Sequence, residues 1–407
     1  MKHFRLKLSL FLNYFLFASL LNSVGTVIFQ VQRNFGVSPS SASVLEACKD
    51  LSIAATSFFV AAWLLRIGYK RAMLAALVAI GAMCVAMPFL ASFWATKLLF
   101  VATGVCFGVM KVSVFATLGL VTDDAKEHAS LMSFLESCFM LGVLAAYFLF
   151  GAFVDDAVPA STAWFRVYFV LAAVAFAAAA LLWTVPVDES RAHAGAAAGG
   201  GLRDMFALAL SPLVLVFALS VFIYVLTEQA IMSWLPTFNH TVLHLPAVLS
   251  VQMAGILAGS TALGRFAAGW LLSRVPWGWV LAVCLAGAAA LVLVALPLAG
   301  ATHGPIDGWR TAPLAAFVFP LIGVFLAPIY PTLNSLVLSS LPPARHAAMA
   351  GVIVIASALG GTSGSLVTGR VFQSYGGQTA FYLSLVPLGL MAVCLGVIGW
   401  MRRAKAA

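Results

Sequence analysis

Residues 277–300 read WGWVLAVCLAGAAALVLVALPLAG, an apolar run that holds no charged residue. A helix of this length crosses a hydrocarbon core of roughly 30 Å. Runs of the same kind recur along the whole chain of 407 residues, in which 63% of the residues are hydrophobic and only 9% are charged. This composition excludes an ordinary soluble domain and predicts an integral membrane protein.

Twelve spans of this kind are predicted, and each is expected to be an α-helix. The runs are too long and too uniformly apolar for the strands of a membrane barrel. The first run lacks a convincing small-residue cleavage site, so we expect it to stay as a helix. The predicted spans are residues 8–31, 42–66, 72–93, 97–121, 129–153, 163–186, 212–238, 248–273, 277–300, 314–341, 347–370 and 379–401.

The basic residues are distributed unevenly between the two ends of the spans. A net charge of +9 invites a nucleic-acid partner, but its placement argues against one. With the amino terminus inside, most Lys and Arg residues flank the cytoplasmic ends, as the positive-inside rule describes. We therefore expect both termini in the cytoplasm and a bacterial cytoplasmic membrane as the location. The outer ends hold only Arg33, Lys97, Arg166, Arg310 and Arg370.

The clearest change of composition lies at residues 188–204, DESRAHAGAAAGGGLRD. This stretch lacks the Lys-Ser/Thr ending and the preceding strand of a phosphate-binding loop, and it is typical of a flexible linker. The predicted organisation is an N-terminal six-helix bundle at 1–187, a cytoplasmic linker at 188–211 and a C-terminal six-helix bundle at 212–407.

The two halves also echo each other. Residues 61–66 read AAWLLR, and residues 268–274 read AGWLLSR at the corresponding place in the second half. An offset of about half the chain is expected for two related bundles of the same orientation, the parallel repeat of major facilitator transporters.

The loop that follows the first echo carries a family signature. Residues 66–71, RIGYKR, resemble the end of the loop motif G-x-x-x-D-R-x-G-R-R of the major facilitator superfamily, with Ala61 in place of the first Gly and Leu65 in place of the Asp. The resemblance implies two six-helix bundles that carry a solute by alternating access. It also implies that Arg66 and Arg71 belong to the cytoplasmic gate, although the acid that normally pairs there is missing.

A narrower resemblance lies in the second half. Residues 224–228, YVLTE, with Trp234 beyond them, and residues 327–332, APIYPT, are similar to motifs of fucose-permease-like sugar:proton symporters. The resemblance implies a sugar-like solute. The first half departs from this branch, because Asn22 stands near the position of one family acid and Lys111 near that of another. The proton-binding carboxylates of the branch are therefore expected elsewhere.

Three charged residues within the 42–66 span share one helix face. Glu46, Lys49 and Asp50 are spaced i, i+3 and i+4, so their side chains are neighbours. Two carboxylates around one ammonium leave an excess negative charge, and one carboxyl can take a proton. The cluster is interpreted as a proton-coupling site or gate. A structural ion pair within one helix and a solvated vestibule are the alternatives.

Other polar residues inside the spans are candidates for the solute path. Glu228, Gln229 and Trp234 offer a carboxylate, an amide and an indole, a set that can hold a polar solute. Glu228 is also a candidate proton-coupling residue beside Glu46 and Asp50. Lys111 can bind an anionic solute group or pair with a carboxylate. For Glu136, an ion pair near the cytoplasmic gate and a role in the solute path are equally compatible with the sequence. Asn22, Tyr330 and Asn334 complete the predicted cavity groups.

A polytopic membrane enzyme or a non-transporting sensor is the alternative from another class, and the residue pattern disfavours it. The six cysteines show no paired spacing, and the outer histidines His240, His244 and His303 are scattered, so we expect no metal, cofactor or catalytic residue. A nucleotide-binding motif is missing, which argues against ATP as the energy source. We expect a monomer in the lipid bilayer whose partners are a small-molecule substrate and protons.

The sequence therefore predicts a secondary transporter of a small polar solute, driven by a proton gradient in symport. The motifs favour a sugar-like solute, whereas Lys49 and Lys111 favour an organic anion. A proton-driven exporter of a metabolite or drug is the alternative that keeps the same fold.

Overall fold

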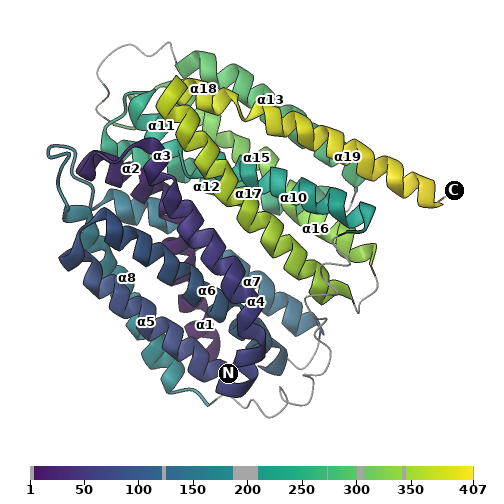
Figure 1. The fold of residues 1–407 in the computed structure, drawn as a ribbon, viewed down its shortest axis with the longest axis horizontal. Coiled ribbons are helices and arrows are strands. Elements are labelled where there is room, and N and C mark those ends of the chain that lie inside the picture. Colours follow the sequence, from purple (N-terminus) through teal and green to yellow (C-terminus); the bar gives the residue numbers. More distant parts are fainter. Residues whose placement is uncertain are drawn as a thin grey trace. The chain divides into compact units, whose positions relative to one another are not determined.

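Every regular element in the part of the chain that the computed structural model describes is a helix, and no strand occurs there (Figure 1). The structure describes residues 4–121, 125–186, 210–272, 274–299, 306, 308–341 and 345–406. Within them, side chains are described except at 4, 58, 60–63, 65–66, 115–116, 118–121, 125–134, 136–137, 338–339, 346–348 and 402–406.

The first half of the chain consists of eight α-helices and one 3₁₀ turn among the described residues. They are α1 (Phe4–Asn22), α2 (Val24–Phe35), α3 (Pro39–Ala42), α4 (Val44–Ile67), α5 (Tyr69–Leu90), α6 (Phe93–Val121), α7 (Ala125–Gly151), η1 (Ala163–Arg166) and α8 (Val167–Trp183).

The second half continues with helices of similar length and several short pieces. They are α10 (Pro212–Met232), α11 (Leu235–Thr241), α12 (Ala247–Leu272), α13 (Trp277–Ala299), α14 (Leu314–Val318), η3 (Phe319–Leu321), α15 (Ile322–Leu326), α16 (Ile329–Ser339), α17 (His346–Tyr375), α18 (Gly377–Tyr382) and α19 (Leu385–Ala406).

These helices account for all twelve predicted spans. Among the described residues, nine helices are long and apolar enough to cross a membrane, and the bent pair α1–α2 makes a tenth. The remaining predicted spans, 42–66 and 129–153, coincide with α4 and α7. Helix α4 carries the charged cluster. In α7, the described apolar part is the shorter segment Cys138–Gly151. The prediction of an all-α membrane protein is confirmed.

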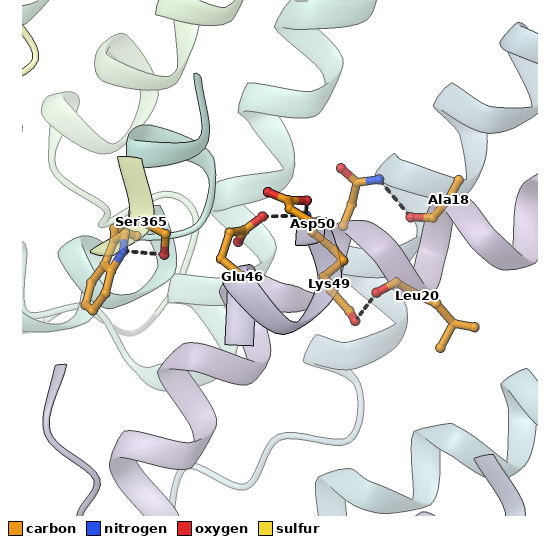
Figure 2. A network of polar contacts seen from close by, with 9 residues as sticks. Ala18, Leu20, Glu46, Lys49, Asp50 and Ser365 are labelled. Atoms are coloured by element: carbon orange, nitrogen blue, oxygen red, sulfur yellow. Dashed lines mark hydrogen bonds and ion pairs between the residues drawn. The ribbon is translucent and has the colours of Figure 1, made fainter. Parts of the chain in front are cut away.

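The prediction of one continuous helix over 8–31 is wrong in detail, since α1 and α2 meet at a bend of 43°. Side chains next to the bend bond to the backbone of the preceding turn, a pattern that often bends helices. The Asn22 amide donates to the Ala18 carbonyl at 2.9 Å, and the Ser23 hydroxyl donates to the Leu20 carbonyl at 2.8 Å. Figure 2 shows both carbonyl acceptors.

The span predicted over 212–238 is also divided. Helix α10 ends at Met232, and Trp234 precedes the first residue of α11 instead of continuing the helix. Pro236 lies in the first turn of α11, where its missing N–H is tolerated. Because Pro236 has no N–H to bond to the carbonyl group of Met232, four residues before it, α10 cannot continue through the proline and a second helix starts instead.

The span predicted over 314–341 contains three α-helical pieces and one 3₁₀ turn. Helix α15 ends at Leu326 and α16 begins at Ile329, so the break falls at Pro328. A proline cannot donate a backbone hydrogen bond to the preceding turn. The Thr332 hydroxyl and backbone N–H both use the Pro328 carbonyl, at 2.6 and 3.3 Å.

The chain divides into two compact units. Unit 1 is Met1–Val37 with Leu45–Ala198, and unit 2 is Ser38–Val44 with Gly199–Ala407. Segment Ser38–Val44 groups with unit 2 because α3 packs against α17, where the Ser40 hydroxyl donates to Gln373 at 2.5 Å. The boundaries 1–187, 188–211 and 212–407 stay predictions, since most of the linker lies outside the described residues.

Helices α10 and α17 form the closest helix pair of unit 2 through glycine. A Cβ atom on Gly360 would lie 2.4 Å from the Phe222 carbonyl oxygen, and one on Gly364 would lie 2.2 Å from that of Leu226. Side chains of any size would separate the two backbones, so small residues set this packing, as is common between membrane helices.

We expect Gly364→Ala to destabilise the protein by about 1–3 kcal/mol, because the added methyl group overlaps backbone atoms that cannot rotate away. Thermal unfolding in detergent measures the effect. Gly389→Ala is the matched control, since nothing lies within 4 Å of the Cβ position there. Equal unfolding temperatures for the two variants would contradict the packing argument.

Candidate functional site

The structure brings the three charged residues of α4 together, as their spacing predicts (Figure 2). The Lys49 ammonium forms an ion pair with Glu46 and lies 3.4 Å from Asp50 Oδ1. The side chains of Glu46, Lys49 and Asp50 are 0%, 5% and 11% exposed. Three formal charges are thus held almost completely inside the protein, where the mutual attraction is strong and the desolvation cost is high.

Two neighbouring helices enclose this cluster within unit 1. On α6, a Cβ atom on Gly104 would lie 2.5 Å from the Lys49 carbonyl oxygen, so the two backbones meet at the lysine itself. On α7, the buried phenol of Tyr147 lies within electrostatic range of Glu46 and Lys49. Neither residue is signalled by a sequence motif, since a lone Gly or Tyr in an apolar span is ordinary.

A second polar cluster lies in unit 2, on α10 and α16. The Tyr224 hydroxyl donates to Glu228 Oε1 at 2.7 Å, one helical turn away. The Tyr224 and Tyr330 rings lie 5.6 Å apart between centroids at an angle of 30°. The Tyr330 hydroxyl lies 3.4 Å from Ser357 Oγ on α17. The cluster therefore combines a half-buried carboxylate with a pair of phenols.

Two further predicted residues lie on the same helices. Gln229 is half-buried next to Glu228 on α10. Asn334 lies one turn beyond Tyr330 on α16, and its buried Oδ1 atom has no hydrogen-bond partner among the described residues. An amide or carboxylate oxygen in this position can accept a hydrogen bond from a polar solute.

Trp234 occupies a different environment from the one that the sequence suggested. Its side chain is fully buried, and its indole N–H donates to Ser365 Oγ at 3.3 Å. The ring packs 5.3 Å from that of Phe372, and its edge lies 2.8 Å from the Cβ position of Gly369. The indole is thus enclosed by α17, and its position does not support a role in binding a solute.

The other predicted site residues either make contacts of a different kind or have side chains outside the described ones. Asn22 uses its amide within its own helix. Lys111 is exposed on α6, with its ammonium 5.9 Å from the centroid of the Phe107 ring, a cation–π geometry. Arg71 is exposed in the first turn of α5. The side chains of Arg66 and Glu136 lie outside the described ones, so their gate roles stay predictions.

The loop with the family signature has a structural role that its sequence did not reveal. Gly68 has φ +89°, a conformation that favours glycine, and precedes α5. Lys70 then donates to the carbonyl groups of Trp183 and Val185, at 3.0 and 2.6 Å. A lysine in this place satisfies carbonyl groups at the end of α8 and holds the two helix ends together.

Two helical units with apolar spans, one holding a buried ion cluster and the other a carboxylate with phenols, fit the class of secondary transporters. In the part of the chain that the structure describes, no group of three or more His, Cys, Asp or Glu side chains can hold a metal ion. The model of the Major Facilitator Superfamily matches residues 10–365, so the chain belongs to this superfamily. It is a transporter and not an enzyme.

Comparison with known proteins supports the fold more than the substrate. No curated protein matches the sequence. A bacterial homologue of the human lysosomal transporter Spinster, inward-facing and occupied, has 14% identity and a TM-score of 0.76, with 98% of this chain and 97% of that chain covered. The nucleoside transporter NupG has 16% identity and a TM-score of 0.69, with 98% and 99% covered.

A proton symporter is among the similar structures. A variant of the E. coli fucose:proton symporter FucP has 17% identity and a TM-score of 0.62, with 98% of this chain and 99% of that chain covered. At identities this low the likeness is one of fold alone. The expected major facilitator fold is confirmed, and the roles of individual residues must be argued from this chain.

We expect Trp234→Phe to lower the stability of the protein by about 1–3 kcal/mol, because the substitution removes the hydrogen bond to Ser365 and leaves a buried hydroxyl unsatisfied. Since the indole is enclosed, the apparent affinity for the transported solute should stay within about twofold of the parent, well under 1 kcal/mol. Unfolding temperature and the KM of uptake measure the two effects. A large rise in KM with unchanged stability would place the indole at the solute.

Proposed function

We propose that this chain is a symporter that couples uptake of a small polar solute to protons by alternating access. The observation that carries the proposal is the buried Glu46–Lys49–Asp50 cluster. Charges persist inside membrane proteins mainly where they serve an ion or solute path. Two solved structures of similar fold are described as proton symporters, for D-xylose and for fucose, which adds support for proton coupling.

The solute is proposed to bind at the cluster on α10 and α16. Glu228 has one oxygen engaged by Tyr224 and can use the other to accept from a solute hydroxyl. The exposed part of Tyr330 offers an aromatic face, and Asn334 offers an unpaired oxygen. This set of acceptors and rings suits a sugar-like solute, while Lys111 keeps an organic anion open as the alternative.

The remaining features of the proposal follow from topology. We place the protein in a bacterial cytoplasmic membrane as a monomer, with both termini in the cytoplasm and bundles at 1–187 and 212–407. Arg66, Arg71 and Glu136 are proposed as gate residues near the cytoplasmic side. In this scheme the two bundles move about a site near the middle of the bilayer, as other transporters with inward and outward states do.

Transport in liposomes tests the proposal. The purified protein is reconstituted, a pH gradient is imposed, and labelled sugars and organic acids are screened. We expect one class of solute to accumulate against its gradient and to leave when a protonophore collapses the pH difference. If no solute is transported, or if the protonophore does not change solute uptake, the proposal of proton-coupled transport is wrong. If the solute moves only in the direction opposite to the protons, the protein is the proton-driven exporter.

We expect Glu228→Gln to weaken solute binding and thereby to lower uphill uptake. Loss of a hydrogen bond to a charged group costs about 1.5–3 kcal/mol, so solute affinity should fall at least about tenfold. Solute binding by the detergent-solubilised protein measures the change directly. Asp156→Asn is the control, because this carboxylate lies exposed in the turn after α7. Normal binding by Glu228→Gln would remove this residue from the proposed site.

A further inference from the structure

The buried cluster of α4 has an imbalance of charge that one proton removes. Glu46 and Asp50 supply two negative charges, and Lys49 supplies one positive charge. A buried ion pair is tolerable when its charges cancel, whereas an uncompensated buried charge is costly. The cluster is neutral with one proton bound and negative without it. The question is which of the two carboxyl groups exchanges that proton.

Glu46 is built into the cluster as a permanent partner of the lysine. Its side chain is 0% exposed, and it makes the closer ion pair with the Lys49 ammonium. The Tyr147 phenol acts on the same pair from α7. A group without access to solvent and with its charge already balanced is a poor site for repeated proton uptake and release.

Asp50 differs from Glu46 in each of these respects. Only its Oδ1 atom approaches the ammonium, at 3.4 Å, and the side chain is the most exposed of the three at 11%. Its Oδ2 atom is buried and has no hydrogen-bond partner among the described residues. A buried carboxylate oxygen without a donor carries the full desolvation cost, and a proton on that oxygen removes the charge.

The backbone of Lys49 is fixed by helix packing. Helix α6 meets the α4 backbone at Lys49 through Gly104, and one turn further along α6 a Cβ atom on Gly108 would lie 2.9 Å from the Thr56 side chain. Because the lysine backbone cannot recede toward α6, the geometry of the cluster changes mainly through its least enclosed side chain. That side chain is Asp50.

We infer that Asp50 is the group that binds and releases the coupling proton at Oδ2, and that Glu46 is the fixed counter-ion of Lys49. This inference rests on the proposed function and assigns roles within that site. In the step, an O–H bond forms at Oδ2 when a proton arrives from water on one side, and the same bond breaks when the proton leaves to the other side. No other bond changes. Among the side chains that the structure describes, the charged groups that act on Asp50 are Glu46 and Lys49.

A matched pair of double variants separates the two carboxyl groups in the liposome assay. Glu46→Gln with Lys49→Met leaves Asp50 as the one carboxyl of the cluster, and proton-driven accumulation should persist at a reduced level. Lys49→Met with Asp50→Asn leaves Glu46 in that place, and accumulation should be lost while exchange of solute without a gradient continues. The reverse pattern would assign the proton to Glu46 and overturn the inference.

Infrared titration gives a readout that does not depend on transport. The absorbance of a protonated buried carboxyl should change with pH in the parent protein and in Glu46→Gln, and the change should be missing in Asp50→Asn. Both single substitutions are nearly isosteric, which keeps the comparison valid if a double variant does not fold. A signal that disappears with Glu46→Gln instead contradicts the inference. Failure of solute uptake with an intact Asp50 signal contradicts only the proposed function.

Discussion

The ion pairs of Lys49 with Glu46 and Asp50 set the constraint on which the polar interior of unit 1 depends. Almost no solvent reaches these three side chains, so the two carboxyl groups and the ammonium depend on one another for charge compensation. Removal of one partner from a buried pair typically costs about 3–5 kcal/mol, because the remaining charge stays inside without compensation. A protein gains no stability from such a cluster over well-packed apolar residues. Its retention in α4 therefore calls for a functional reason.

The same packing device accompanies the polar cluster in each unit. In unit 1, Gly104 brings α6 onto the α4 backbone at Lys49. In unit 2, Gly360 and Gly364 bring α17 onto α10, the helix that carries Tyr224 and Glu228. Contacts between backbones leave little room for a helix to shift locally. Each cluster is consequently held by rigid neighbours, and changes within it are confined to side chains and protons.

The helices of this fold could be predicted from the sequence because their cause is local. A span needs about 20 apolar residues, and the i, i+3, i+4 spacing places Glu46, Lys49 and Asp50 on one face whatever surrounds them. The interruptions were harder to predict. The bend at Ser23 depends on a hydroxyl and an amide group that donate hydrogen bonds to backbone carbonyl groups of the preceding turn. The end of α10 depends on a proline four residues beyond Met232.

Site residues were predictable only as far as their partners lie on the same helix. Glu228 meets Tyr224 one turn away, a contact that spacing can reveal. The contacts of Trp234 with Ser365 and of Tyr330 with Ser357 join segments far apart in the chain, and no local pattern encodes them. For this reason the sequence suggested a binding role for an indole that tertiary packing encloses.

The carboxylates on α4 and the carboxylate on α10 differ in the kind of partner that they contact. This difference bears on which cluster binds the proton and which binds the solute in the proposed transporter. Asp50 and Glu46 depend on a cation, so binding of a proton changes the net charge of a closed cluster. Glu228 accepts from a neutral phenol, so its free oxygen stays available to a solute whatever the state of unit 1. A charge change that is costly to bury favours water access. Coupling therefore fits the cluster on α4, and solute recognition fits the one on α10 and α16.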